Sequence, residues 1–386
     1  MKIKGIHHIS NLVNHPQENI EFYTSLMGLR LIKKAVNFDD ASTYHFYYGN
    51  NNADIGTVIT SFPIGENTKD GVKGGGQIVS TYYNIPKGSF DFWLERIKSF
   101  DLNVSIINRF NKKHLVFSDY LGITNELVEE DSNRVNIYSF NGIHKNNAIL
   151  GFNGALAHSK SPEETLDFFI NILGASVSLE DDNYYRLNLN SNFAGILDLS
   201  KKSFKKGNLS KGTVHHIAFS VDSLEDLLKF KEKIEKLNIF VTKVRERQFF
   251  KAIYFKEPGG MIIELSTMKP GFNSSEIDDQ GTKLFLPNHF LDKRELIESK
   301  LIPVYVKPVS KLKRHHYLDH DGYLKELRFH EVLTRINELS KLSKERSLTD
   351  DEIIEQKSLR KEYLNTFKNN FKNHLENIEI EDITWN

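Results

Sequence analysis

Residues 5–28 read GIHHISNLVNHPQENIEFYTSLMG, and residues 151–174 read GFNGALAHSKSPEETLDFFINILG. A shift of 146 positions (151 minus 5) lays the second stretch on the first without a gap. Each copy begins as an apolar strand and continues as a helix that opens near a proline, a favourable first helical residue. The closing glycines, Gly28 and Gly174, suit a left-handed helix stop. The chain therefore contains a repeated structural unit.

Two weaker copies of this unit run from about 77 to 130 and from about 213 to 267. Each carries apolar residues at helical spacing after its first strand. Short β-like runs follow the helices, as at Tyr44–Tyr48 and Gly56–Phe62 in the first copy. The predicted unit is one strand, one helix and about three strands, and it occurs four times. This pattern predicts an α+β fold of four βαβββ units.

The composition and hydrophobic periodicity of the chain change after about residue 300. We expect a first pair of units at 1–135, a second pair at 136–300, a linker at 301–329 and a helical hairpin at 330–386. The linker contains prolines and basic residues without a clean period, whereas apolar residues at helical spacing follow it. Thr349, which precedes a run of acidic residues, is the predicted cap of the second helix of the hairpin.

The composition excludes several classes of protein. There are no cysteines, which rules out disulfides, iron–sulfur clusters, zinc–thiolate sites and cysteine nucleophiles. The 51 Lys and Arg residues balance the 51 Asp and Glu residues, so neither nucleic acid nor a membrane surface is an expected partner. No run of apolar residues is long enough to span a bilayer, and the first residues lack a signal peptide pattern. A cytoplasmic location is expected.

Two doubled histidines, His7-His8 and His215-His216, open segments that otherwise read as buried strands. Because side chains alternate along a strand, one histidine of each pair can point into a given pocket. Glu264 interrupts another apolar strand, and burying a carboxylate is costly unless it is paired or binds a metal. Two imidazoles and one carboxylate form the facial triad of non-haem Fe(II) oxygenases, which leaves coordination positions open for dioxygen and substrate.

The repeats allow a test of this hypothesis within the chain. Histidine pairs occur in units one and four, whereas unit three has Gly154 at the matching position (8 plus 146) and unit two has no histidine. Only a pairing of unit one with unit four would bring two histidines together with Glu264. Spacing alone does not decide which histidine of each pair is the ligand. The last-strand positions that match Glu264 hold Glu126 in unit two, Asp198 in unit three and Thr60 in unit one.

At these residues the chain resembles the vicinal-oxygen-chelate superfamily and, more narrowly, the ring-cleaving dioxygenases that act on para-hydroquinones. The resemblance extends over about residues 1 to 300. It implies that the βαβββ units form two cupped sheets and that Fe(II), with Mn(II) less favoured, is held by His8, His216 and Glu264. The matching stretches are GIHHI from Gly5, FYTSLMGLRLIKKAVNFDD from Phe22, STYHFYYG from Ser42, GTVITSFP from Gly56, IPKGS from Ile85, VHHIAF from Val214 and PGGMIIE from Pro258.

The resemblance also implies four residues around the metal: Ser10, His215, Arg247 and Tyr254. An arginine suits a developing anion, and His215 or Tyr254 could transfer a proton. A solvated side chain is the alternative interpretation of Arg247, which lies in a charged run. The implied activity is the extradiol-type opening of a hydroquinone or related dihydroxybenzene by dioxygen, with a role in quinone detoxification.

Two other functions remain open at this stage. A glyoxalase-type lyase or isomerase uses the same scaffold, but such sites usually have four protein ligands and only three are found here. A non-enzymatic protein that binds small molecules would use the cup without a metal. The sequence leaves a homo-oligomer open.

The segment 331–381 resembles a family of short bacterial two-helix proteins, the YnzC-like proteins, whose chemistry is not known. The matching residues begin TRINELSKLSKERSLTDDE and continue LRKEYLNTFKNNFKNHL. A histidine- and aspartate-rich cluster at 315–321 precedes it, and a solvated loop is the preferred interpretation of that cluster over a metal site.

Overall fold

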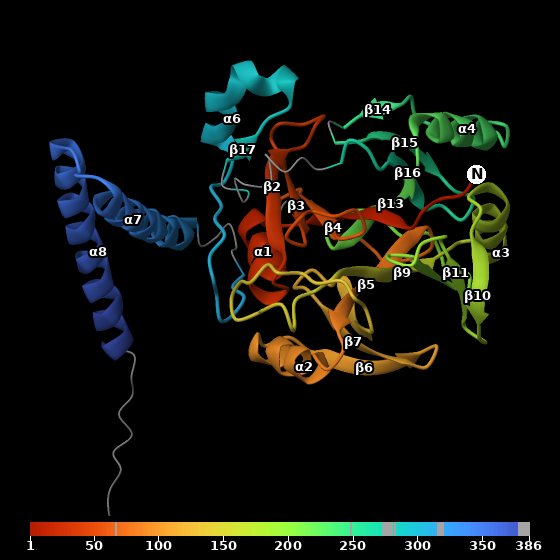
Figure 1. Ribbon diagram of the computed structural model, residues 1–386, viewed down its shortest axis with the longest axis horizontal. Helices are drawn as coiled ribbons and strands as arrows, with labels where there is room; N and C mark the ends of the chain where they lie inside the picture. The colour runs from red at the N-terminus through yellow and green to blue at the C-terminus, as the bar shows by residue number, and fades with distance from the viewer. Residues whose placement is uncertain (66–67, 248, 272–280, 282, 315–319, 377–386) are drawn as a thin grey trace, which may run out of the picture. The chain divides into compact units, whose positions relative to one another are not determined.

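The chain folds as four βαβββ units and a helical hairpin, in the computed structural model shown in Figure 1. The structure describes residues 1–65, 68–247, 249–271, 281, 283–314 and 320–376, and only the backbone of 320–327 and 367–376. It forms two compact units, Met1–Arg314 and His315–Asn386. The predicted four-unit fold with a C-terminal hairpin is therefore confirmed. The 315–321 cluster lies outside the residues whose side chains are described.

Each βαβββ unit has the predicted order of elements. Unit one contains β1 (Ile6–Val13), α1 (Pro16–Ile20), η1 (Glu21–Leu26), β2 (Arg30–Val36), β3 (Tyr44–Gly49) and β4 (Val58–Pro63). Unit two contains β5 (Gln77–Pro86), α2 (Phe90–Ser99), β6 (Val104–Arg109), β7 (Lys112–Ser118) and β8 (Thr124–Glu130). Unit three contains β9 (Gly151–His158), α3 (Pro162–Asp167), η2 (Phe168–Ile172), β10 (Ser176–Glu180), β11 (Tyr184–Asn188) and β12 (Ile196–Ser200). Unit four contains β13 (Thr213–Val221), α4 (Leu224–Glu235), β14 (Arg245–Glu246), β15 (Lys251–Lys256) and β16 (Ile262–Thr267).

The helices of units one and three start and stop where the sequence predicts. Pro16 and Pro162 occupy the first helical positions, where a missing N–H breaks no hydrogen bond. Both helices widen into a π-helical turn, η1 and η2. Both then end at a glycine with positive φ, +66° at Gly28 and +75° at Gly174, a backbone conformation that a side chain would strain.

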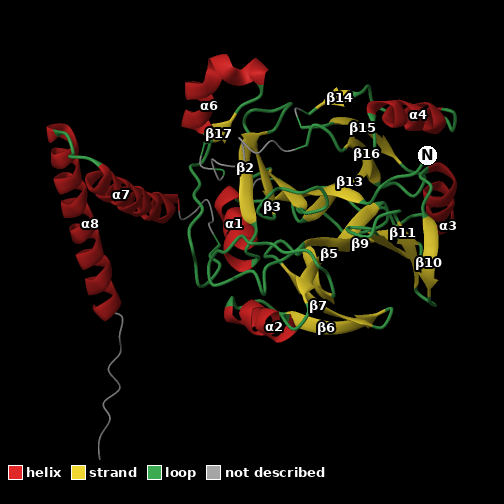
Figure 2. Ribbon diagram, viewed as in Figure 1, coloured by secondary structure: helices red, strands yellow, loops and turns green. Residues whose placement is uncertain are grey.

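The strands form two sheets, each of which joins two units. The first sheet has the order β14-β15-β16-β13-β1-β4-β3-β2-β17, with β17 (Leu284–Phe285) added at its edge. The second sheet has the order β10-β11-β12-β9-β5-β8-β7-β6. Unit one therefore pairs with unit four through antiparallel β1 and β13, and unit two with unit three through β5 and β9. Figure 2 shows α2, α3 and α4 on the outside of these strands.

The inferred pairing of unit one with unit four is confirmed by this topology. The predicted segments 1–135 and 136–300 each group two units that are neighbours in sequence. The sheets group the units differently, because the first sheet joins units one and four and the second joins units two and three. Apolar side chains under the helices form one continuous core, in which Tyr23, Trp93 and Phe230 are fully buried. Their burial holds each helix against the outer face of its sheet and leaves the inner face of the first sheet for the site.

Residues 301–314, expected to be linker, lie against the body of the four units. They follow η3 (Asn288–Lys293) and α6 (Arg294–Lys300) and contain no helix or strand. Their backbone carbonyls accept hydrogen bonds from side chains of units one and two: Tyr44 Oη to Ile302 at 2.9 Å and Tyr120 Oη to Leu312 at 2.8 Å. This segment thus forms a strap that packs on units one and two.

The hairpin consists of α7 (His320–Glu345) and α8 (Asp350–Glu376), and α7 begins earlier than the expected residue 330. Its two helices are antiparallel, since Arg328 pairs with Glu362 and Arg335 with Glu355. The predicted cap of α8 is confirmed: Thr349 Oγ1 accepts from the backbone N–H of Glu352, whose carboxylate accepts from Thr349 N–H in return. None of the described helices is long and apolar enough to cross a membrane.

Candidate metal centre

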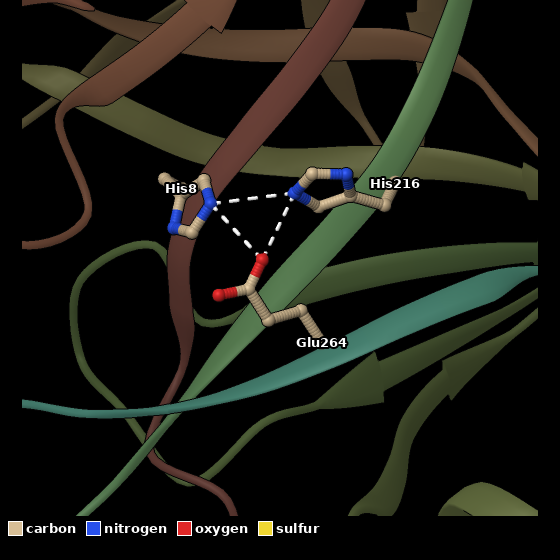
Figure 3. A group of neighbouring side chains, drawn as sticks. All are labelled: His8, His216 and Glu264. Atoms are coloured by element: carbon tan, nitrogen blue, oxygen red, sulfur yellow. Dashed lines mark hydrogen bonds and ion pairs between the residues drawn. The ribbon is translucent and has the colours of Figure 1, made fainter. Parts of the chain in front are cut away.

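Three neighbouring strands of the first sheet carry the predicted ligands. His8 lies on β1, His216 on β13 and Glu264 on β16, and all three are buried. Figure 3 shows the side chains pointing toward one another from the adjacent β1 and β13 and from β16. His8 Nε2 lies 3.4 Å from His216 Nε2 and 3.3 Å from Glu264 Oε2, and His216 Nε2 lies 3.0 Å from the same oxygen. The register therefore brings three candidate ligand atoms to one point.

The spacing of these atoms fits a single divalent ion. Imidazole nitrogen and carboxylate oxygen bind such ions at roughly 2.0–2.2 Å, so ligands on neighbouring coordination positions lie roughly 3.0–3.4 Å apart. The three measured separations fall in that range. Glu264 Oε1 accepts a hydrogen bond from Ser266 Oγ at 2.6 Å, while Oε2 is buried without a well-directed hydrogen bond. An ion would satisfy this oxygen, so the cluster fits a metal better than a hydrogen-bonded triad.

The protonation states in the cluster also suit a metal. Burial alone would raise the pKa of Glu264, but the facing His8 and His216 hold it well below its usual range. Burial lowers the pKa of His216 despite the neighbouring carboxylate. Metals bind the ionised carboxylate and the neutral imidazole, so the fold favours these forms of Glu264 and His216.

Each ligand histidine is oriented by the histidine that precedes it. Nδ1 of His7 lies 2.9 Å from Nδ1 of His8, and Nδ1 of His215 lies 2.7 Å from Nδ1 of His216. If Nε2 of a ligand binds metal, its Nδ1 carries the proton and donates to the partner. The partners then carry their own protons on Nε2. Burial lowers the pKa of both His7 and His215 to about 3, which keeps them neutral.

The cluster opens into a cavity of about 410 Å³. Strands of units one and four form its walls, and aromatic side chains supply much of its surface. All four residues that the resemblance placed around the metal line this cavity: Ser10, His215, Arg247 and Tyr254. The fold therefore places these four side chains and the three candidate ligands around one space.

Ser10 and Tyr254 contact the cluster in different ways. Ser10 Oγ lies 2.9 Å from His216 Nε2 and 2.7 Å from Oγ1 of Thr60. Tyr254 pairs with Glu264 across β15 and β16, and its hydroxyl accepts a hydrogen bond from Arg247 Nε at 3.2 Å. Burial and the carboxylate of Glu264 raise the pKa of Tyr254 well above its ordinary value, so its hydroxyl is protonated at neutral pH.

Arg247 remains charged within this wall. Burial works against its charge, but Tyr254, Asp39 and Glu264 together raise its pKa. Its side chain is 21% exposed, and its Nη1 lies 3.7 Å from Asp39 Oδ2. The arginine thus contributes a positive charge to the cavity.

Several polar residues of the cavity wall were not predicted from the sequence, among them Lys33 on β2 and His45 and Tyr47 on β3. The ammonium of Lys33 lies 3.8 Å from the centre of the Phe249 ring and 3.3 Å from that of Phe285. Alternation along the stretch that contains His45 and Tyr47 could have indicated that both share one face. Lys33 left no comparable signal, because its aromatic partners come from distant segments.

The second sheet carries the corresponding acids but surrounds them differently. Arg186 binds Asp198 with two hydrogen bonds, Nε to Oδ1 at 2.7 Å and Nη2 to Oδ2 at 2.8 Å. Glu126 Oε2 accepts from Arg109 Nη1 at 2.8 Å and lies 2.7 Å from His114 Nδ1. Guanidinium groups therefore occupy the place beside these carboxylates.

Comparisons with known proteins agree with this geometry. The family model for the Glyoxalase/Bleomycin resistance protein/Dioxygenase superfamily matches residues 5–109 and 153–265. The chain is 38% identical over 310 residues to "Putative ring-cleaving dioxygenase MhqO" of Bacillus subtilis (strain 168), covering 80% of this chain and 99% of that protein. It is 30% identical over 284 residues to "Chlorohydroquinone/hydroquinone 1,2-dioxygenase" of Sphingobium indicum, covering 71% and 88%.

A solved structure and a second family model complete the comparison. The crystal structure of a "putative dioxygenase from Bacillus subtilis subsp. subtilis str. 168" superimposes with a TM-score of 0.77 at 38% identity, covering 80% of this chain and 99% of that one. Residues 331–384 match a bacterial protein family of unknown function, DUF896. The chain therefore belongs to the glyoxalase/bleomycin resistance protein/dioxygenase superfamily, within it to the ring-cleaving dioxygenases, and it carries a DUF896 segment after the dioxygenase part.

Proposed function

We propose that this protein is an Fe(II)-dependent, extradiol-type dioxygenase that opens the ring of a hydroquinone or a related dihydroxybenzene. The observation that carries the proposal is the cluster of His8, His216 and Glu264, in which three ligand atoms on one side leave the remaining coordination positions facing the cavity. When bound, Fe(II) supplies open positions for dioxygen and a substrate oxygen and allows the spin-forbidden reaction between them. Mn(II) is the less favoured alternative.

The size of the cavity supports a single aromatic ring as substrate. A cavity of about 150 Å³ admits benzene, so about 410 Å³ can hold one substituted ring together with dioxygen. Phe62, Phe249 and Phe250 supply apolar surface for such a ring. The name of the Sphingobium indicum relative supports hydroquinones as the substrate class.

The described residues bring three candidate ligands together and no fourth, which favours the dioxygenase over a glyoxalase-type lyase. Ser10 and Ala218 each lie two residues after the ligand histidine of their strand. Ser10 pairs with Thr60, and Ala218 pairs with Glu264, so Thr60 of unit one corresponds to Glu264 of unit four. The Thr60 hydroxyl is hydrogen-bonded to Ser10 and cannot replace a carboxylate as a ligand. Unit one would therefore supply His8 to a metal and no carboxylate at the position that matches Glu264.

The surrounding residues hold and transfer protons in this proposal. His215, whose Nδ1 accepts from the ligand His216, presents its Nε2–H to the cavity as a hydrogen-bond donor. Arg247 stabilises negative charge that develops on the ring oxygen or on dioxygen. Tyr254, protonated and held by Arg247, donates from the other side. Ser10 orients the small ligand beside His216.

Iron content and dioxygen uptake test the proposal directly. Protein purified without dioxygen and loaded with Fe(II) should bind about one iron per chain and consume dioxygen with methylhydroquinone in a panel of hydroquinones and catechols. Zinc or nickel with activity on the hemithioacetal of methylglyoxal would instead support the lyase. Failure to bind any metal would support a binding protein and overturn the dioxygenase.

The cellular role follows from the same activity. Removal of hydroquinones would protect a cell from the quinones that form from them, and we propose quinone detoxification in the cytoplasm as that role. Assembly into a homo-oligomer is compatible with the sequence and stays a prediction.

A further inference from the structure

His45 is held in one orientation on the wall of the cavity. Its Nδ1 lies 2.9 Å from the hydroxyl of Tyr47, two residues along β3. Its ring stacks on Phe62 of the neighbouring β4, with ring centres 4.0 Å apart and an angle of 22° between the planes. A hydrogen bond in the ring plane and a stacking contact on its face together determine where Nε2 points.

The Nε2 atom of His45 is buried and has no hydrogen-bond partner among the described residues. Of the described residues that line the cavity, only Glu264 has another buried side-chain atom without such a partner. The metal accounts for Glu264 Oε2. A buried polar atom without a partner is rare in proteins, so Nε2 of His45 also requires one. His45 lines the cavity, so a molecule bound there is the candidate partner.

The position of His45 in the sheet places it far from the metal ligands across the cavity. β3 is separated from β1 by β4, which corresponds to about 10 Å of sheet. Tyr47 pairs with Thr60, which pairs with Ser10, so Tyr47 is level with the metal cluster. His45 follows on the same face of β3, beside Phe62. A flat ring with one oxygen at the metal can reach this wall with a group on its opposite side.

We propose that His45 Nε2 hydrogen-bonds the second hydroxyl of the substrate and thereby selects rings whose two hydroxyls lie opposite each other. This inference rests on the proposed function, because the first hydroxyl is placed at the metal. An adjacent hydroxyl, as in a catechol, would lie beside the metal and leave Nε2 unpaired. The hydrogen bond works with either tautomer of His45, because a phenol hydroxyl both donates and accepts.

A binding cycle with two ligands tests this contact. Dissociation constants for hydroquinone and phenol, which lacks the second hydroxyl, are measured on Fe(II)-loaded protein without dioxygen. We expect the wild-type protein to bind hydroquinone at least about 10-fold more tightly than phenol. His45→Asn, which removes the polar atom at the Nε2 position, should weaken hydroquinone binding about 10-fold and change phenol binding less than about 2-fold.

Conservative variants separate a substrate contact from a structural role. His45→Gln places an amide near the former Nε2 position and should restore part of the preference for hydroquinone. Tyr47→Phe, which frees the His45 ring, should reduce the preference by less than His45→Asn does. His158 provides the matched control, because it stacks on Phe204 at 3.7 Å but does not line the cavity. His158→Asn should leave both dissociation constants unchanged.

The results distinguish failure of this inference from failure of the proposed function. Equal losses of hydroquinone and phenol binding in His45→Asn, or no loss, would overturn the role of His45. So would a wild-type protein that binds both ligands equally. If His45→Asn does not fold, the same comparison in His45→Gln and Tyr47→Phe decides. A protein that shows the predicted binding cycle but consumes no dioxygen with any dihydroxybenzene retains the His45 contact and loses the ring-cleaving activity.

Discussion

The first and second sheets hold carboxylates at matching strand positions and surround them with different side chains. Glu264 in the first sheet faces His8 and His216, which together with it can hold a metal ion. Asp198 and Glu126 in the second sheet face the guanidinium groups of Arg186 and Arg109. A buried carboxylate requires a favourable partner: the second sheet provides guanidinium groups, whereas the first sheet provides two histidines that form a candidate metal site with Glu264.

The difference arises at one position of the first strand of each unit. Units one and four have His8 and His216 there, whereas unit two has Ser80 and unit three has Gly154. A Cβ atom on Gly154 would lie 2.6 Å from the carbonyl oxygen of Ile196, so no side chain fits without a shift of the backbone. The second sheet therefore cannot acquire a histidine pair by substitution at these positions alone.

The largest expected effect comes from removing the carboxylate of the candidate metal site formed by His8, His216 and Glu264. Glu264→Gln should abolish stoichiometric iron binding and lower the rate of dioxygen uptake by more than roughly 100-fold. Mutation of a residue that only hydrogen-bonds a metal ligand usually costs up to roughly 100-fold, and loss of a ligand itself should cost more. Iron content by elemental analysis and oxygen-electrode rates measure this. Glu126→Gln is the matched control on the second sheet and should retain iron and activity. Equal loss of iron in both variants would contradict a division of roles between the sheets.

Arg186→Met tests the other side of the comparison. It leaves Asp198 buried without its two hydrogen bonds, and breaking a buried ion pair typically lowers the free energy of unfolding by about 3–5 kcal/mol. Urea unfolding of the protein should show this loss, while the iron content of the folded variant stays at the wild-type level. Unchanged stability would show that the guanidinium is not the required cation.

Arg247→Met addresses an arginine of the cavity wall and should affect catalysis rather than folding. Removal of one donor from a developing anion typically lowers kcat by about 100-fold. Steady-state dioxygen uptake measures kcat, and urea unfolding should show a smaller loss of stability than in Arg186→Met, because Arg247 is partly exposed. A variant with wild-type kcat would support the alternative of a solvated arginine.

The smallest expected effect is a pH dependence of stability at Glu126. Burial by itself would raise the pKa of Glu126, but His114 and Arg109 hold it below the ordinary value of 4.5. A carboxyl with a lowered pKa in the folded state stabilises the fold above its unfolded pKa, and this contribution disappears as the pH falls through the folded pKa. At neutral pH the wild-type protein should exceed Glu126→Gln by about 1–3 kcal/mol in free energy of unfolding.

Unfolding measured at several pH values checks this sign. The difference between wild type and Glu126→Gln should stay constant between pH 7 and pH 5 and shrink below about pH 4.5. A difference that grew toward acid would mean that the folded state raises this pKa.

Local signals account for the parts of the fold that the sequence predicted. Pro16, Gly28 and Thr349 mark helix ends through contacts within a few residues, so their effect is readable from the neighbouring sequence. The internal repeat extended this reach, because it allowed positions in different units to be compared. That comparison identified unit four as the partner of unit one and Glu264 as the carboxylate that joins the two histidines.

The sequence by itself thus determined the four units, their helix boundaries, the hairpin and the types of residue at the metal cluster. Tertiary structure decided what surrounds them: the arginines beside Asp198 and Glu126, the packing of residues 301–314, the early start of α7 and the unpaired nitrogen of His45. The physical reason is distance along the chain. Tyr120 and Leu312 are 192 residues apart, and contacts of that kind depend on the packing of the whole fold, which no local pattern encodes.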